Sequence, residues 1–411
     1  MRGALFNAMT PGWTRDGEWI SFPSMSSTAR AITLLERLVG IDTTSALSNV
    51  PLIEFVRAEL AALGVEARVM MEGDKANLHA IIGPRVAGGI ALSAHVDCVP
   101  VEGQAWLADP FQLRRQDGRL IGRGTTDMKG FVACALAMVP AMLAADLVRP
   151  FHLCLTHDEE TTFRGAERLM DELGHEAPPP ALCIVGEPSA MTPIVAHKGY
   201  ASWDVVITGL SGHSSRADET ANALMAAAEA VSWLKAEARH LAAQGRRVEG
   251  FLPPYTTVHA GTFHSGTVLN IVPDRAEFTF EIRSVPGDLA DDILSRFVTH
   301  VQSAILPELR AVHPASTMTV SPRSVAPALA LDDPHPLRAM TQRASGSNSL
   351  GFVSYGTEAG FYQRAGIPTI VCGPGHIAQA HQPEEWITES QIEACCTFLA
   401  RLIEDQERGT R

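Results

Sequence analysis

The sequence predicts an α/β fold in which a mostly parallel central sheet is flanked by helices and a smaller α+β layer is inserted into the chain. Three observations lead to this prediction. Short runs rich in Val, Ile and Leu alternate with stretches of helical periodicity. These runs are apolar at nearly every position, as expected of strands buried on both faces. The pattern then changes between about 193 and 323, which marks the insertion.

The main layer begins with a helix behind Pro51, where Leu52, Val56 and Leu60 recur at helical spacing and Gly64 stands where the helix would stop. Four buried strands follow along the chain, at 89–93, 151–156, 181–185 and 369–372. Helical patterns separate or follow them, from about 128, near 166 and from about 389. Such alternation is typical of α/β construction.

The inserted layer has its own order of elements. We expect a strand at 194–207, a helix at 221–242, strands at 256–262 and 276–283, a helix at 289–305 and a last strand near Met318. This βαββαβ order predicts a separate α+β domain. The predicted division is therefore 193–323 for the inserted domain, with 1–192 and 324–411 forming one discontinuous domain. Two domains also suit a chain of 411 residues.

Composition and charge exclude several classes of function. A formal net charge of −13 without any Lys/Arg-rich run argues against nucleic acid and against an anionic membrane surface as partners. The longest apolar stretch, 131–145, is too short to span a bilayer. The first 25 residues lack the apolar segment of a secretion signal. Seven cysteines, an odd number set mostly in apolar runs, are expected as buried free thiols, so we predict a cytoplasmic protein.

Polar side chains follow the predicted buried strands, at the edge where ligands bind in open α/β sheets. One further acid, Asp127, lies in a glycine-rich turn that enters a helix. The residues that follow the strands are His95, Asp97, Glu159, Glu160, Glu187 and His381. Taken singly, each could be a helix cap or a solvated side chain. Together they predict a divalent-metal site, because acids at several strand ends would repel one another without a cation.

A pair of ions would account for most of these residues. If Asp127 bridges two ions, each needs about two further protein ligands, and the chain offers four. Those four are His95, Glu187, Glu160 and His381. Glu159 is left over, so it is the candidate general base. Asp97, two residues after His95 in an extended segment, is placed to hold the other imidazole nitrogen and fix its tautomer.

Five motifs, in order, resemble those of the di-zinc acetylornithine deacetylase, succinyl-diaminopimelate desuccinylase and aminoacylase family. They are Ser-Ala-His-Val-Asp at 93–97, Gly-Arg-Gly-Thr-Thr-Asp-Met-Lys-Gly at 122–130, Asp-Glu-Glu at 158–160, Gly-Glu-Pro-Ser at 186–189 and the late His381. The resemblance runs from about 29 to 402. It implies a metallopeptidase-like catalytic domain, an inserted lid and dimerisation domain, and a homodimer.

The resemblance also implies roles for single residues. One metal would be held by His95, Asp127 and Glu187, and the other by Asp127, Glu160 and His381. Both would be divalent, with Zn²⁺ expected and Co²⁺ as an alternative. Glu159 would be the base and Asp97 the acid that orients the histidine. His213, in Ser-Gly-His-Ser-Ser at 211–215, matches a histidine that reaches the partner subunit's site, where it would stabilise an oxyanion.

The substrate expectation rests on stretches that resemble bacterial acetylornithine deacetylases, at 42–45, 48–56, 253–259 and 375–383. They imply hydrolysis of N-acetyl-L-ornithine to L-ornithine and acetate, a step of arginine biosynthesis. Asn270 and Arg283 match lid positions associated with substrate binding, and Arg283 could clamp a carboxylate with two hydrogen bonds. The alternative interpretations are structural: Asn270 could form a turn, and Arg283 could be a surface charge.

Other interpretations remain open. Arg164, His264 and His376 depart from the family pattern and could reshape the substrate pocket. The alternatives are a deacylase of another N-acyl amino acid, a succinyl-diaminopimelate desuccinylase, a metal-dependent aminopeptidase and a dimeric binding protein without activity.

Overall fold

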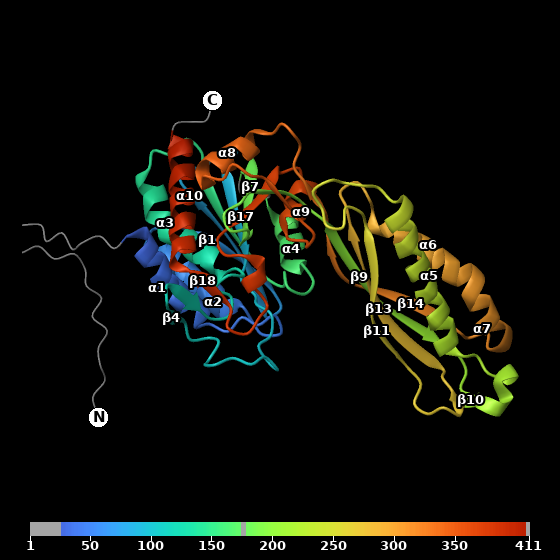
Figure 1. Ribbon diagram of the computed structural model, residues 1–411. Coiled ribbons are helices and arrows are strands. Elements are labelled where there is room, and N and C mark those ends of the chain that lie inside the picture. The colour runs from blue at the N-terminus through green and yellow to red at the C-terminus, as the bar shows by residue number, and fades with distance from the viewer. Residues whose placement is uncertain (1–25, 174–177, 408–411) are drawn as a thin grey trace, which may run out of the picture.

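The computed structural model describes residues 26–173 and 178–407, which fold into two layered bodies side by side (Figure 1). The expectation about a secretion signal concerns residues outside this part of the chain. Among the described residues, no helix combines the length and the apolar character needed to cross a membrane. All seven cysteines are free and buried, as predicted.

The larger body is built on a sheet of nine strands, whose order is β1-β2-β6-β3-β7-β17-β8-β15 with β16 also paired to β8. The strands are β1 (Ala67–Glu72), β2 (Lys75–Ile82), β3 (Ile90–His95), β6 (Phe151–Thr156), β7 (Leu182–Pro188), β8 (Ile194–His197), β15 (Leu329–Ala330), β16 (Gly351–Val353) and β17 (Thr369–Gly373). Every residue of β3, β6 and β17 is buried, which is why these strands read as continuous apolar runs.

The expectation of a mostly parallel sheet needs correction, because the sheet is mixed. Only the central strands β6-β3-β7-β17 run parallel to one another, and β16 runs parallel to β8. The pairs β1–β2, β2–β6, β17–β8 and β8–β15 are antiparallel. A two-residue connection joins β1 to β2, and such a short link permits only an antiparallel hairpin.

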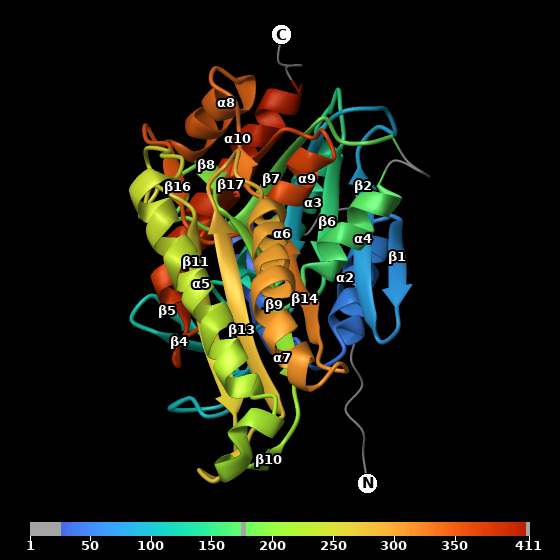
Figure 2. The same cartoon turned by 90° about the vertical axis from the view of Figure 1, so that its right-hand side faces the viewer.

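Helices cover both faces of this sheet (Figures 1 and 2). They are α1 (Ser27–Val39), α2 (Val50–Ala62), α3 (Lys129–Ala144), α4 (Arg164–Glu172), α8 (Pro336–Ser345), α9 (Ala359–Arg364) and α10 (Glu389–Glu407). The predicted helix behind Pro51 is α2. The main apolar core joins α1, α3 and α10 to the sheet, and a second cluster joins α4 and α9 to its other face. Beside them, β4 (Arg114–Gln116), β5 (Arg119–Ile121) and β18 (Trp386–Thr388) form a small sheet.

The second body is an antiparallel four-stranded sheet in the order β11-β13-β9-β14. Its strands are β9 (Gly199–Thr208), β11 (Thr257–Ser265), β13 (Arg275–Ser284) and β14 (Met318–Ala326), and its helices are α5 (Ala223–Gln244), α6 (Ala290–His300) and α7 (Leu306–Val312). Alternate residues of β13 are buried, and Trp203, Phe278 and Phe280 of the sheet share a core with Phe297 of α6. The order of the major elements is the predicted βαββαβ.

The boundary between the bodies differs from the predicted one. The expected strand 194–207 is two strands, because β8 belongs to the large sheet and β9 to the second. The chain crosses at Lys198, and a Cβ on the next residue, Gly199, would lie 2.6 Å from Ser284 Oγ. β14 continues to Ala326, three residues past the predicted end of the inserted domain. The division into two domains, with a lid and dimerisation role for the second, stays a prediction.

Candidate metal centre

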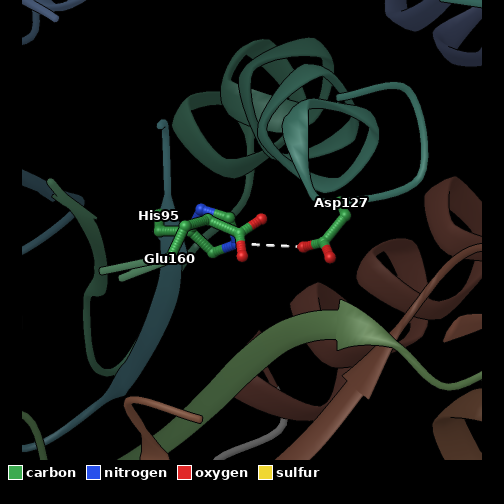
Figure 3. Close-up of side chains that lie close together, drawn as sticks. All are labelled: His95, Asp127 and Glu160. Atoms are coloured by element: carbon green, nitrogen blue, oxygen red, sulfur yellow. Dashed lines mark hydrogen bonds and ion pairs between the residues drawn. The ribbon is translucent and has the colours of Figure 1, made fainter. Parts of the chain in front are cut away.

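The structure brings the five predicted metal ligands together at the carboxyl ends of the central strands. His95 ends β3, Glu187 lies in β7, and Glu160 follows β6. Asp127 comes from the turn before α3, and His381 comes from the loop after β17. Residues far apart in sequence therefore share one small volume, part of which is drawn in Figure 3.

Asp127 lies between the two imidazoles, with one carboxylate oxygen directed to each. His95 Nε2 is 3.0 Å from Asp127 Oδ1 and 3.6 Å from Glu187 Oε1. On the other side, His381 Nε2 is 3.3 Å from Asp127 Oδ2 and 3.0 Å from Glu160 Oε1. A carboxylate placed in this way can serve as a bridge between two ions.

Glu159 also lies within reach of this cluster. Ligand atoms of His95, Asp127 and Glu160 all lie within 4.8 Å of one another, and so do those of His95, Glu159 and Glu187. The geometry therefore allows two roles for Glu159, the predicted general base or a further metal ligand.

The acids of the cluster are poorly compensated in charge. Burial, then the charge of Glu187, raises the pKa of Glu159 well above its usual range. Burial and Asp127 raise the pKa of Glu187 likewise, and they raise the pKa of Glu160 to about 7. Each carboxylate would ionise more readily beside a cation. Imidazole nitrogens and carboxylate oxygens are ligands that zinc and similar divalent ions accept, so the residues present fit such ions.

The imidazoles show the opposite perturbation. Hydrogen bonds to Asp127 and Glu160 raise the pKa of His381 to about 10. Burial acts to lower the pKa of His95, but its hydrogen bonds to Asp127 and Asp97 raise it well above 6.5. Burial acts to raise the pKa of Asp127, yet His381 and His95 outweigh it and lower that pKa. Protonated imidazoles thus partly offset the negative charge of the acids. Bound cations would offset the same charge.

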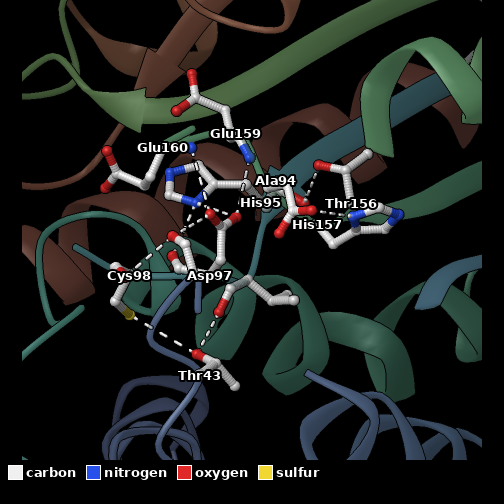
Figure 4. Close-up of polar contacts among 12 residues, drawn as sticks. Thr43, Ala94, His95, Asp97, Cys98, Thr156, His157, Glu159 and Glu160 are labelled. Atoms are coloured by element: carbon white, nitrogen blue, oxygen red, sulfur yellow. Dashed lines mark hydrogen bonds and ion pairs between the residues drawn. The ribbon is translucent and has the colours of Figure 1, made fainter. Parts of the chain in front are cut away.

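Asp97 is fully buried and contacts His95 in a different way from the predicted one (Figure 4). His95 Nδ1 is 3.0 Å from the backbone oxygen of Asp97 and 3.5 Å from its carboxylate Oδ1. The carboxylate accepts hydrogen bonds from the backbone N–H of Glu159 (3.1 Å) and of Glu160 (3.3 Å), and from Ser45 Oγ (2.8 Å). Asp97 therefore holds the loop of both acids as well as the imidazole.

A cavity of about 190 Å³ opens beside the cluster and is lined in part by the second body. The predicted Arg283 of β13 lines it; its Nε donates to Glu281 Oε1 at 2.9 Å, and its guanidinium lies 5.0 Å from the centre of the Tyr200 ring. The lining residues Tyr200, Phe163 and Tyr355 were not predicted from the sequence. Tyr355 comes two residues after β16, which runs antiparallel to β17, so the rule for the carboxyl ends of the parallel strands does not apply to it.

Two predicted residues lie far from this cavity within the same chain. His213 is in β10 (Gly212–His213), which pairs with β12 (Ile271–Val272) at the far tip of the second body (Figure 1). Asn270 precedes β12, and its backbone oxygen accepts a hydrogen bond from the N–H of Ser214 at 3.0 Å. His213 and Asn270 are both exposed, and the structure does not bring them to the cluster.

The three departures from the family pattern are not lining residues of the cavity, although Arg164 and His376 directly adjoin the lining residues Phe163 and Ile377 in sequence. Arg164 pairs with Glu72 on the surface. His264 is in the edge strand β11, and the Nδ1 of His376 accepts a hydrogen bond from the N–H of Ala378 in the short helix η3 (Ile377–Gln379). The expectation that they reshape the pocket stays a prediction.

Comparisons with known proteins agree with the motifs. An acetylornithine deacetylase from Myxococcus xanthus is 35% identical over 391 residues, covering 92% of this chain and 98% of that relative. A family M20 metallo-carboxypeptidase from Sulfolobus solfataricus has a TM-score of 0.73 at 16% identity, covering 92% and 99% of the two chains. A Bacillus subtilis protein described as a dinuclear metal-binding peptidase of that family has a TM-score of 0.62 at 16% identity, covering 92% and 97%.

The family resemblance drawn from the motifs is thereby confirmed, and so is the metallopeptidase-like fold. The sequence pattern of peptidase family M20/M25/M40 matches residues 91–405, which is most of the chain. The chain belongs to peptidase family M20/M25/M40.

Proposed function

We propose that this chain hydrolyses the amide bond of an N-acyl amino acid at a centre of two divalent cations, with N-acetyl-L-ornithine as the leading substrate. Membership of the family makes the chain a metal-dependent amidohydrolase. The observation that carries the two-ion proposal is the position of Asp127, whose two oxygens face one imidazole each. The substrate is supported by the full-length similarity to relatives named acetylornithine deacetylase.

The distances support the proposed division of the ligands between two ions. His95, Asp127 and Glu187 would hold one ion, and Asp127, Glu160 and His381 the other. The nitrogen and oxygen donors suit Zn²⁺, with Co²⁺ as an alternative. When bound, the ions would polarise the scissile carbonyl and lower the pKa of a water molecule.

The chemistry of the chain's own residues centres on Glu159. Its carboxylate would take a proton from the attacking water and return it to the amide nitrogen as the C–N bond breaks, which releases acetate and the free amine. The position of Glu159 beside His95 and Glu187, with its side chain lining the cavity, supports this role. Arg283 would bind the substrate carboxylate and so orient the acyl group toward the cluster.

A second copy of the chain would complete the site. His213 and Asn270 lie together at the exposed tip of the second body, where Val268, Leu269 and Ile271 are also exposed. A homodimer through this body would let His213 of one subunit reach the other subunit's cavity and stabilise the oxyanion. If so, mixing equal amounts of the inactive variants His213→Ala and Glu159→Gln should restore roughly a quarter of wild-type activity. Random pairing makes about half of the dimers mixed, and one of the two sites in each mixed dimer is intact. No restoration in dimers shown to exchange subunits would contradict the role in trans.

Release of acetate from N-acetylornithine by metal-loaded protein, with and without chelator, tests both substrate and cofactor. Turnover that chelator abolishes would support the proposal. A panel of other N-acyl amino acids, N-succinyl-diaminopimelate and simple dipeptides separates the alternatives, since an aminopeptidase would require a free amino terminus. Binding of these compounds without any turnover would instead favour a protein that is not an enzyme.

A further inference from the structure

We propose that Glu385 is a positioning residue that holds two metal ligands in register, by tying the turn of Asp127 to the loop of His381. The proposal rests on the two-metal centre proposed above. Glu385 contributes no ligand atom to the cluster. It acts through the backbone that carries the ligands.

The Glu385 side chain is buried, and both of its carboxylate oxygens accept hydrogen bonds from the segment just before α3. Oε1 accepts from the backbone N–H of Thr126 at 2.8 Å and of Asp127 at 3.1 Å. Oε2 accepts from the backbone N–H of Gly124 at 3.0 Å and from Arg123 Nη1 at 2.8 Å. One carboxylate thus binds three peptide N–H groups of a single turn.

This contact bears directly on the bridging acid. The side chain of Asp127 leaves a backbone whose own N–H is bound to Glu385, so the direction of its carboxylate depends on that bond. Asp127 must present one oxygen to each imidazole, which leaves little freedom of rotation. Small errors in the turn would therefore disturb both proposed ion sites.

Glu385 also belongs to the loop of the last ligand, four residues after His381. Among the described residues, the ion pairs of the His381 ring run through Nε2 to the acids, so its aim depends on the loop backbone. Arg123, paired with Glu385, also donates to the side chain of Gln104, and Gln104 Nε2 donates to the backbone oxygen of His381 at 3.3 Å. Arg123 Nη1 also donates to the backbone oxygen of Gln382 at 3.4 Å, and Thr126 Oγ1 donates to that of Trp386 at 2.6 Å. Among these links, the Glu385 carboxylate is the one that binds the backbone N–H of Asp127 itself.

The network requires an ionised carboxylate. Each oxygen of Glu385 already accepts hydrogen bonds from two N–H groups, so no lone pair is left to carry a carboxyl proton. Burial raises the pKa of Glu385, and the adjacent Arg123 opposes that effect. Glutamine has nearly the same shape, but its NH₂ group would replace one oxygen and face the two donors which that oxygen accepts.

The test is the affinity of metal-free protein for Co²⁺ and Zn²⁺, titrated on the Glu385→Gln variant. We expect at least one of the two ions to bind about 10- to 100-fold more weakly, as is usual when a group behind a metal ligand is removed. The matched control is Glu384→Gln, one residue earlier in the same loop, because Glu384 pairs with Arg114 at the surface. We expect that variant to bind both ions within about twofold of wild type.

The visible absorption of bound Co²⁺ reports ligand geometry separately from folding. Glu385→Gln should change this spectrum, whereas Glu384→Gln should leave it as in wild type. Wild-type affinities and an unchanged Co²⁺ spectrum in Glu385→Gln would overturn the inference while leaving the proposed function intact. A wild-type protein that binds no ions would refute the proposed function itself.

A milder variant covers the case in which Glu385→Gln does not fold. Glu385→Asp keeps the charge but shortens the side chain by one methylene, so it cannot hold all four donors as Glu385 does. We expect it to weaken the binding of one ion about three- to tenfold. Wild-type affinity for both ions in a folded Glu385→Asp protein would then decide against the inference.

Discussion

Acidification from about pH 7.5 to about pH 5 should destabilise this protein through two buried histidines far from the metal centre, His79 of β2 and His152 of β6. Their rings stack with centroids 5.3 Å apart, and His79 Nε2 lies 3.0 Å from His152 Nδ1. His152 Nε2 lies 3.2 Å from the backbone oxygen of Gly88, which can only accept a hydrogen bond. His152 Nε2 therefore carries the hydrogen, and its Nδ1 accepts from His79. A proton added at His152 Nδ1 would meet a donor.

The size of the effect follows from the pKa values. Burial, then the charge of His152, lowers the pKa of His79 from 6.5 to about 4, and burial lowers the pKa of His152 to about 4. Between pH 6.5 and pH 4 the unfolded chain binds protons that the folded chain does not. The two neutral histidines therefore contribute fully to the free energy of unfolding above pH 6.5, and this contribution falls as the pH drops below 6.5. At pH 5 the loss is about 2 kcal/mol for one histidine and at most about 4 kcal/mol for the pair.

Urea unfolding of metal-free protein at the two pH values measures this loss. Other groups titrate in the same range, so the informative quantity is the difference between wild type and the double variant His79→Gln/His152→Gln, which should lose about 2 to 4 kcal/mol less on acidification. The exposed His240 supplies the control, since His240→Gln should behave as wild type. Equal losses in wild type and double variant would refute the reasoning.

Three further outcomes test the metal centre. Glu159→Gln should lower kcat by about 10²- to 10⁴-fold, while elemental analysis should still find two ions per chain. Loss of an ion in this variant would show that Glu159 is a ligand instead of the base. Chelator should lower Tm more at pH 8 than at pH 6. The pKa of Glu160 is about 7, so in the metal-free protein this carboxyl is mostly protonated at pH 6 and repels its acidic neighbours less. An equal drop in Tm at the two pH values would contradict this. Arg283→Met should raise KM about 10- to 100-fold with kcat less affected, and an unchanged KM would remove the carboxylate clamp.

The parts of the site that were predictable lie next to long buried strands. His95 and Glu187 could be placed because β3 and β7 are recognisable as apolar runs, and the edge where such strands end is a property of the fold. Tyr355 lies outside this rule, because β16 runs antiparallel to β17 and the rule concerns the carboxyl ends of the parallel strands. Sequence patterns therefore locate ligands that follow the parallel central strands and miss lining residues that other elements place.

Features that depend on tertiary contact were out of reach of the sequence. The crossing at Lys198 lies inside the predicted strand 194–207, where His197, Lys198 and Gly199 interrupt the apolar residues. Which sheet each half joins depends on strand pairing that this short interruption does not specify. The nearer contact of His95 Nδ1 with the carbonyl of Asp97, instead of its carboxylate, depends on a backbone turn that spacing does not specify. Glu385 had no local signal either, since its four donors come from about 260 residues earlier in the chain.

Charge balance at the centre argues for two ions instead of one. Four carboxylates, Asp127, Glu159, Glu160 and Glu187, meet there, and the charge of Asp97 behind them is already stabilised by two N–H groups and a hydroxyl. Two divalent cations with neutral imidazoles would neutralise the four acids, whereas a single cation would leave two negative charges in a largely buried site. The raised pKa values of three of these acids are the same imbalance seen without any ion. A metal titration that saturates at one ion per chain would contradict this argument.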